Sequence, residues 1–101
     1  MISKKDFIWT IGFQGNTAIV NKRERLGHRN LDPKVLLEDG LLRAALCSAL
    51  WEQEIEGKAG ALETFRQSFA SVTGLGLAVD DIKRMLGVYQ VPRENLSVMG
   101  V

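Results

Sequence analysis

A chain of 101 residues favours one compact domain, and we take residues 1–101 as a single unit. Hydrophobic residues make up 46% and charged residues 25%, as in an ordinary globular protein, and no apolar stretch approaches the roughly 18 residues that a membrane span requires. The single cysteine cannot form an internal disulfide bond, and the N-terminal residues lack the apolar segment of a secretion signal, so we expect a cytoplasmic protein with no membrane partner.

The net charge of +1 conceals an uneven distribution along the chain. Residues 1–34 carry seven cations against three carboxylates, whereas residues 35–101 carry six against nine. Such a split is typical of a basic working surface on a neutral-to-acidic body, although chance clustering on a solvated helix face would give the same counts. The basic residues in the first third of the chain are therefore the first candidates for a polyanion-binding surface.

Helix start and stop signals divide the N-terminal quarter into two short elements around a bend. Ser3 can cap a helix that Asp6 supports three residues later, which approximates a capping box, and Gly12 ends this helix. Asn16 can then cap a second helix over residues 17–26. This pattern predicts a helix, a bend and a second helix.

The same stretch also fits a β-hairpin over residues 7–20, with Gly15-Asn16 as a two-residue turn. In that hairpin Phe13 would pair with Ala18, Ile11 would pair with Val20, and one face would carry Phe7, Trp9, Ile11 and Phe13. The density of β-branched residues favours strands, whereas the caps at both ends and the helical remainder of the chain favour helices. We predict the two helices and keep the hairpin, which would make the fold α+β, as the alternative.

Residues 32–87 carry the strongest helix signals and are predicted to form a helical core. Asp32 and Pro33 make a favourable helix opening, and glycines follow the segments in which apolar residues recur every three or four positions. The expected helices lie at 33–39, at 41–54, from 61 to Gly74, and in a brief segment capped by Asp80 and closed by Gly87. We therefore predict a mainly α-helical bundle of about five short helices.

The tail over residues 88–101 reads as extended. Pro92 favours an extended residue before it, and residues 96–101 fit either a short strand or a loose end.

With two helices at its N-terminus, the segment 3–27 resembles the helix-turn-helix unit of DNA-binding proteins. Gly12 lies at the bend, and the buried places of the unit are occupied by Ile8, Ile11 and Phe13. By this resemblance, the residues that would face bases are Gln14, Asn16, Thr17 and Asn21, because amides offer paired donors and acceptors to base edges. The residues that would contact phosphates are Lys22, Arg23, Arg25 and Arg29.

The spacing of Gly12 and Gly15 is also similar to the Gly-x-x-Gly loop of KH domains, which clamps a nucleic-acid backbone. Phe13 and Gln14 stand where those loops carry basic residues, and too few residues precede Ile8 to form the leading strand of that fold. We therefore do not adopt a KH fold.

No group of residues in the sequence is typical of an enzyme. His28 is the only histidine, so the His-His and His-Cys pairs of metal sites are absent, and no serine has a nearby histidine and acid. Cys47 lies in an apolar helical segment, which predicts a buried, unreactive thiol. We predict no catalytic residues, no metal and no cofactor.

The sequence thus favours a small nucleic-acid-binding protein, of a size suited to a regulator, that contacts the phosphates of DNA or RNA through the basic segment 22–29. The alternative is a helical protein-protein interaction or oligomerisation module in which the basic residues only confer solubility. Its partner or second copy would bind the Leu41–Trp51 helix or the tail 88–101, and an exposed Trp9 or Trp51 would be a typical anchor.

Overall fold

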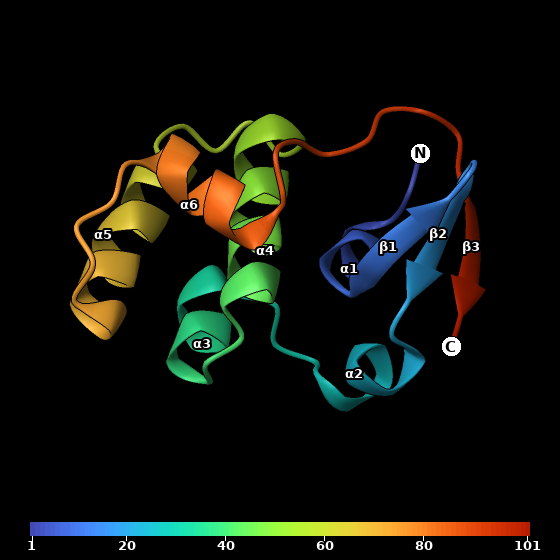
Figure 1. Ribbon diagram of the computed structural model, residues 1–101, viewed down its shortest axis with the longest axis horizontal. Coiled ribbons are helices and arrows are strands. Elements are labelled where there is room, and N and C mark those ends of the chain that lie inside the picture. Colours follow the sequence, from blue (N-terminus) through green and yellow to red (C-terminus); the bar gives the residue numbers. More distant parts are fainter.

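Strands occur near both ends of the chain in the computed structural model, which describes residues 1–101 (Figure 1). Half of the residues are helical, and a three-stranded mixed sheet makes the protein a small α+β domain. The elements in chain order are α1 Lys4–Ile8, β1 Thr10–Gln14, β2 Thr17–Val20, α2 Lys22–Gly27, α3 Pro33–Glu38, α4 Leu42–Glu54, α5 Ala61–Thr73, α6 Val79–Leu86 and β3 Ser97–Gly100.

The predicted helical bundle with a helix-turn-helix unit at 3–27 is therefore wrong, and the alternative α+β fold describes the protein better. Ser3 does cap the first helix, since its Oγ accepts a hydrogen bond from the Asp6 amide at 3.1 Å. That helix ends after Ile8, however, and the chain continues directly into a β-hairpin. The β-branched residues of this stretch favour the strands, because they pack well on a pleated surface and lose rotamer freedom in a helix.

The hairpin turns at Gly15-Asn16, and Phe13 pairs with Ala18 as the alternative predicted. Gly15 adopts a φ of +59°, which only a glycine reaches without strain and which a tight hairpin turn requires. Val20, however, pairs with Thr10 rather than Ile11, because a bulge shifts the register between Thr10 and Gly12. The predicted apolar face is consequently split: Phe7 and Trp9 are buried, while Ile11 and Phe13 are exposed.

The end of the tail completes the sheet. Strand β3 pairs in parallel with β2, and the strand order is β1-β2-β3, so that β1 and β3 are both edge strands. In Figure 1 the red strand β3 lies beside β2, with the helices α3 to α6 on the far side of the molecule. The C-terminal segment is thus a strand, one of the two options left open for residues 96–101.

Helix α4 lies at the centre of the helical part, and its residues from Ala44 to Glu52 are all buried. Helices α3 and α5 pack against it, and the predicted helical core of 32–87 is present with its expected helix boundaries shifted by one or two residues. One boundary differs in kind: Ala78, not Asp80, is the N-cap of α6, and Asp80 lies in the first turn. The burial of α4 leaves most of the Leu41–Trp51 helix inaccessible to a partner.

The short helix α1 joins the sheet to the helices. The ring of Phe7 lies 6.3 Å from that of Trp51, and the guanidinium of Arg43 on α4 donates a hydrogen bond to the Thr10 carbonyl at the start of β1. A single cluster of buried apolar residues includes Ala18 and Val20 of the sheet as well as the centre of α4. Trp9 and Trp51 both belong to this cluster and so do not serve as exposed anchors.

We predict that Leu50→Ala lowers the free energy of unfolding by about 2–5 kcal/mol, because Leu50 is fully buried and its truncation leaves a cavity at the centre of α4. The matched control is Leu26→Ala, which removes the same atoms from a side chain that is 68% exposed and should change stability by no more than about 0.5 kcal/mol. Urea unfolding followed by tryptophan fluorescence measures both. Equal effects of the two substitutions would contradict the central position of α4.

Candidate functional site

The basic segment 22–29 contains the six-residue helix α2 and the two residues after it. Asn21 is the N-cap of this helix, since its Oδ1 accepts a hydrogen bond from the Glu24 amide at 3.1 Å. Asn21 was predicted to face bases, but in this structure its carboxamide oxygen is committed to the cap.

Two side-chain contacts hold α2 against the rest of the fold. Arg25 Nε lies 2.5 Å from the Asp6 carboxylate on α1, and the His28 ring stacks on Trp9, with 4.9 Å between centroids. Within α2 and its C-cap, His28 Nε2 lies 2.8 Å from Glu24 Oε2. The charge of Arg25 is thus partly neutralised by Asp6, so Arg25 attracts a phosphate less strongly than its place in the basic segment suggests.

The remaining predicted phosphate contacts are free. Lys22, Arg23 and Arg29 are exposed, and no carboxylate of the chain forms an ion pair with them. They form the free cationic part of the segment, which we call the α2 basic surface.

The other predicted base-facing residues lie at the opposite end of the hairpin. Gln14 and Thr17 pair at the last rung beside the turn, and Asn16 belongs to the turn and accepts a hydrogen bond from the Ser97 amide. The four residues of β2 separate them from the α2 basic surface by roughly 13 Å, at about 3.3 Å for each residue. The structure therefore does not bring the two predicted sets of contacts together.

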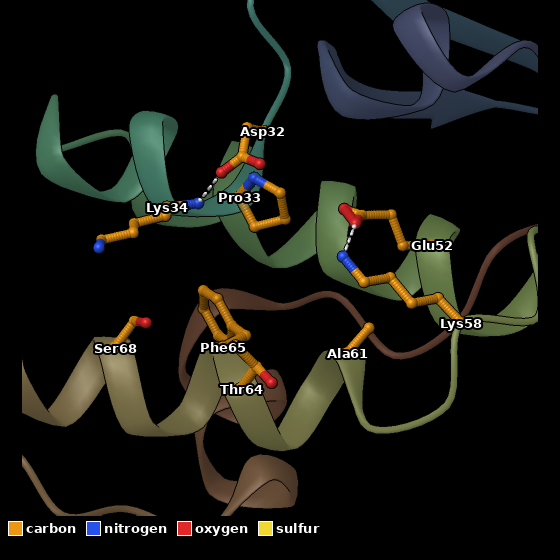
Figure 2. Close-up of a pocket in the computed structure, with 9 residues that line it drawn as sticks. All are labelled: Asp32, Pro33, Lys34, Glu52, Lys58, Ala61, Thr64, Phe65 and Ser68. Atoms are coloured by element: carbon orange, nitrogen blue, oxygen red, sulfur yellow. Dashed lines mark hydrogen bonds and ion pairs between the residues drawn. The ribbon is translucent and has the colours of Figure 1, made fainter.

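A polar cleft of about 240 Å³ lies between the start of α3, the end of α4 and helix α5 (Figure 2). Glu52, only 8% exposed, and Lys58 point toward one another at one end of it, with 3.1 Å between Lys58 Nζ and Glu52 Oε1. Asp32 Oδ1 at the rim accepts a hydrogen bond from the Lys34 amide and so caps α3. Both carboxylates therefore already have partners within the chain: Asp32 caps α3, and the buried charge of Glu52 is neutralised by Lys58.

The hydrogen bond and the charge of Glu52 raise the pKa of Lys58 above its ordinary value of 10.5. Desolvation opposes this shift, and the charges of Asp32 and Glu56 add weaker attraction. Lys58 is therefore protonated at neutral pH.

Cys47 lies in the buried centre of α4. Burial raises the pKa of its thiol to about 11, and the nearby charge of Arg43 opposes that shift only in part. The thiol is therefore protonated and shielded at neutral pH, which agrees with the burial predicted from the sequence.

Strand β3 lies in the tail 88–101, which the alternative prediction named as a partner site without foreseeing an open sheet edge. All four of its residues are exposed, and so is Val101, with 45% exposure for Val98 and for Met99. The Ser97 amide donates to the carbonyl of Asn16, just before β2, and the Val101 amide donates to the carbonyl of Val20. The Val101 carbonyl accepts from the Lys22 amide. Because successive residues of a strand point their backbone groups to opposite sides, the amides and carbonyls of Val98 and Gly100 point away from β2. The outer edge of β3 is open.

The strand itself is uncharged, but charged residues lie near it: Asp6, Lys22 and Arg25 line a hollow together with Val98 and Gly100. Met99 lies beside Ile19 of β2 in the parallel register, and the stem of Lys22 packs over Gly100, where a Cβ would lie 3.3 Å from Lys22 Cδ. The signal in the sequence was the uncharged run Ser-Val-Met-Gly-Val at residues 97–101.

Comparison with family models, curated proteins and solved structures finds no match for this chain. No helix combines the length and the hydropathy that crossing a membrane demands. No three His, Cys, Asp or Glu side chains lie close enough together to hold a metal ion.

We predict that Lys58→Met lowers the urea midpoint at neutral pH, because Glu52 is left buried without its counter-charge. Since the folded-state pKa of Lys58 is raised, the stabilising contribution is fully present below the unfolded-state value of 10.5 and is lost as the pH rises through the folded-state value. The difference between wild type and variant should therefore shrink as the pH rises above 10.5.

The control is Lys34→Met, which changes a second lysine of the same cleft that forms no ion pair. A difference between Lys58→Met and wild type that stays constant with pH would show that the Glu52–Lys58 pair does not stabilise the fold.

Proposed function

We propose that the protein is a small protein-protein interaction module whose working surface is the open edge of β3. The observation that supports this proposal is an exposed, uncharged edge strand whose outward backbone groups, on Val98 and Gly100, have no partner within the chain. Pairing with an extended strand would satisfy these groups, and adding a strand to a sheet edge is a common mode of recognition.

The two edges of the same sheet differ in a way that favours this surface. The β1 edge carries a bulge between Thr10 and Gly12, and the Thr10 carbonyl already accepts a hydrogen bond from Arg43. Bulges, charges and prolines are the usual protection of a sheet edge against unwanted pairing. Strand β3 has none of these features between Ser97 and Gly100, which is expected of an edge that pairs with a partner.

The apolar side chains at this edge supply a further driving force. Val98, Met99 and Val101 are each at least 45% exposed and lie on consecutive or alternate positions of one short segment. Burying such side chains against a partner strand removes apolar surface from water at about 25 cal/mol for each Å². The role assigned to the tail 88–101 in the alternative prediction is retained here in a narrower form, restricted to its last strand.

Nucleic-acid binding remains a second candidate, because Lys22, Arg23 and Arg29 are exposed and unpaired. Without a helix-turn-helix unit, base readout by Gln14, Asn16, Thr17 and Asn21 has no geometric support. Binding through the α2 basic surface would consist of phosphate contacts alone and would be independent of sequence.

A photoreactive amino acid placed at Met99 tests the interaction surface in the cells that produce the chain. We expect covalent adducts of defined mass at this position and a loss of these adducts when Val98→Pro is added, because proline removes an outward amide of the edge. The matched control is the same photoreactive residue at Val72 on α5, which is similarly exposed at 51%. Absence of adducts at Met99, or equal adducts at Met99 and Val72, would refute the proposed surface.

A salt titration of duplex DNA or RNA binding tests the second candidate. If the α2 basic surface contacts phosphates, combining Lys22→Glu, Arg23→Glu and Arg29→Glu makes the slope of log affinity against log salt shallower by about 1 for each residue. The control variant carries Lys34→Glu, Lys83→Glu and Arg84→Glu, an identical change of net charge on the helical part. If both triple variants bind alike, the cations of α2 have no specific role in binding nucleic acid.

A further inference from the structure

We infer that the strand pairing with β3 is β3 of a second copy of this chain, placed antiparallel across a twofold axis that passes beside Met99. This inference rests on the proposed function, because it names the partner of the same edge. The resulting dimer joins two three-stranded sheets into one continuous sheet of six strands.

The backbone of β3 is complementary to itself in this register. Val98 and Gly100 point their amides and carbonyls outward, as the bonds that Ser97 and Val101 make on the β2 side require. When Met99 lies opposite Met99 of the other copy, Val98 faces Gly100 of that copy, and each such pair exchanges two hydrogen bonds. All outward groups of both strands are then satisfied, with none left over inside the strand.

The side chains fit the same register. The two Met99 residues form the central pair that is not hydrogen-bonded, in which Cα atoms approach to about 4.5 Å and side chains are in contact. Val98 meets a glycine in the partner strand, so its branched side chain does not oppose another bulky one. The stem of Lys22, which covers Gly100 in each copy, borders the space that Val98 of the other copy would fill.

Charge complementarity selects the antiparallel orientation. Lys22 lies at the C-terminal end of β3, and Glu94 precedes its N-terminal end by three residues; both are exposed and neither forms an ion pair within the chain. Antiparallel pairing places Lys22 of one copy and Glu94 of the other at the same end of the ribbon. Parallel pairing would bring like charges together, which is unfavourable.

The isologous arrangement also explains why a single unprotected edge is tolerated. When β3 of one copy pairs with β3 of the other, neither β3 edge remains exposed. The outermost strands of the combined sheet are then the two β1 strands, each with its bulge. The assembly therefore closes as a dimer, whereas pairing β3 with a β1 edge would leave a free edge on every added copy and would lead to open-ended association.

Sedimentation equilibrium of the full chain over roughly 1 µM to 1 mM tests the dimer, since an interface built on one short strand is small and its affinity is expected in this range. We expect reversible dimerisation, and we expect Val98→Pro to weaken it at least tenfold. Proline removes an outward amide and fills the interface with its ring, but it spares the hydrogen bonds from β3 to β2, to which the Val98 amide does not contribute.

The control is Val98→Thr, which retains the amide and the β-branched shape and should dimerise within about threefold of wild type. Circular dichroism verifies that both variants are folded. A wild-type chain that stays monomeric at the highest concentration, or a folded Val98→Pro variant that dimerises like wild type, would overturn the inference.

A charge exchange tests the orientation. Lys22→Glu alone should weaken the dimer about three- to fivefold, because two symmetric pairs are lost and like charges face each other. Combining Lys22→Glu with Glu94→Lys should restore the affinity. If the double variant dimerises no better than Lys22→Glu alone, the antiparallel arrangement is wrong.

The result also separates this inference from the proposed function. If the chain is monomeric but Met99 still forms adducts with a different protein, and Val98→Pro abolishes them, the result supports the interaction module and refutes the dimer. If the chain is monomeric and gives no such adducts, both the interaction module and the dimer are refuted.

Discussion

The burial of helix α4 on all of its sides is the constraint on which the rest of the structure depends. Between Arg43 and Glu52 the helix carries no charged residue, and every side chain from Ala44 to Trp51 is buried. A helix that is apolar around its whole circumference cannot face water, so other elements must cover each of its sides. Small residues such as Ala45, Ala49 and Ser48 let those elements approach closely, and α1, α3 and α5 do so.

This constraint explains the position of the sheet. Helix α1 covers the side of α4 that α3 and α5 leave free, and its Phe7 packs near Trp51. The hairpin begins directly after α1, and Arg43 at the start of α4 bonds to the Thr10 carbonyl at the start of β1. The sheet is therefore joined to the helical core through α1, through the Arg43 guanidinium, and through Ala18 and Val20, which pack in the common core. Strand β3 pairs with β2 and contacts the Lys22 stem at the start of α2.

The helical core was predictable from the sequence because its signals are local. The Asp32-Pro33 opening, the apolar spacing of 41–54 and the glycine after residue 73 each depend on neighbours in the chain, and all three helices are present. The N-terminal unit was predicted wrongly because its helix signals and strand signals overlap in the same residues, and the Ser3 cap is satisfied by a helix of only five residues. The hairpin forms instead of the second helix because Ala18 and Val20 pack into the core, and such long-range packing cannot be predicted from a local sequence pattern.

The candidate site was predictable to a similar extent. The cations of 22–29 could be identified from the sequence, but the loss of Arg25 to Asp6 and of Asn21 to a helix cap depends on how α1 and α2 meet in space. The open edge of β3 could not be foreseen, because parallel pairing joins residues 17–20 to residues 97–100 across most of the chain. The uncharged run at 97–101 was visible, yet its meaning depends on its being an edge.

Lys22 connects the two candidate surfaces. Lys22 is the first residue of α2, and its aliphatic stem lies over Gly100 at the β3 edge. Its ammonium group belongs to the α2 basic surface. A polyanion that recruits this ammonium would draw it away from the carboxylate of a second copy, and a dimer that holds it would reduce the charge offered to phosphates. Because any such coupling between two sites is reciprocal, occupation of one surface must weaken the other by the same factor. The proposed interaction module and the candidate phosphate-binding surface would therefore compete for one end of the sheet, and the affinity for either would depend on how far the other is occupied.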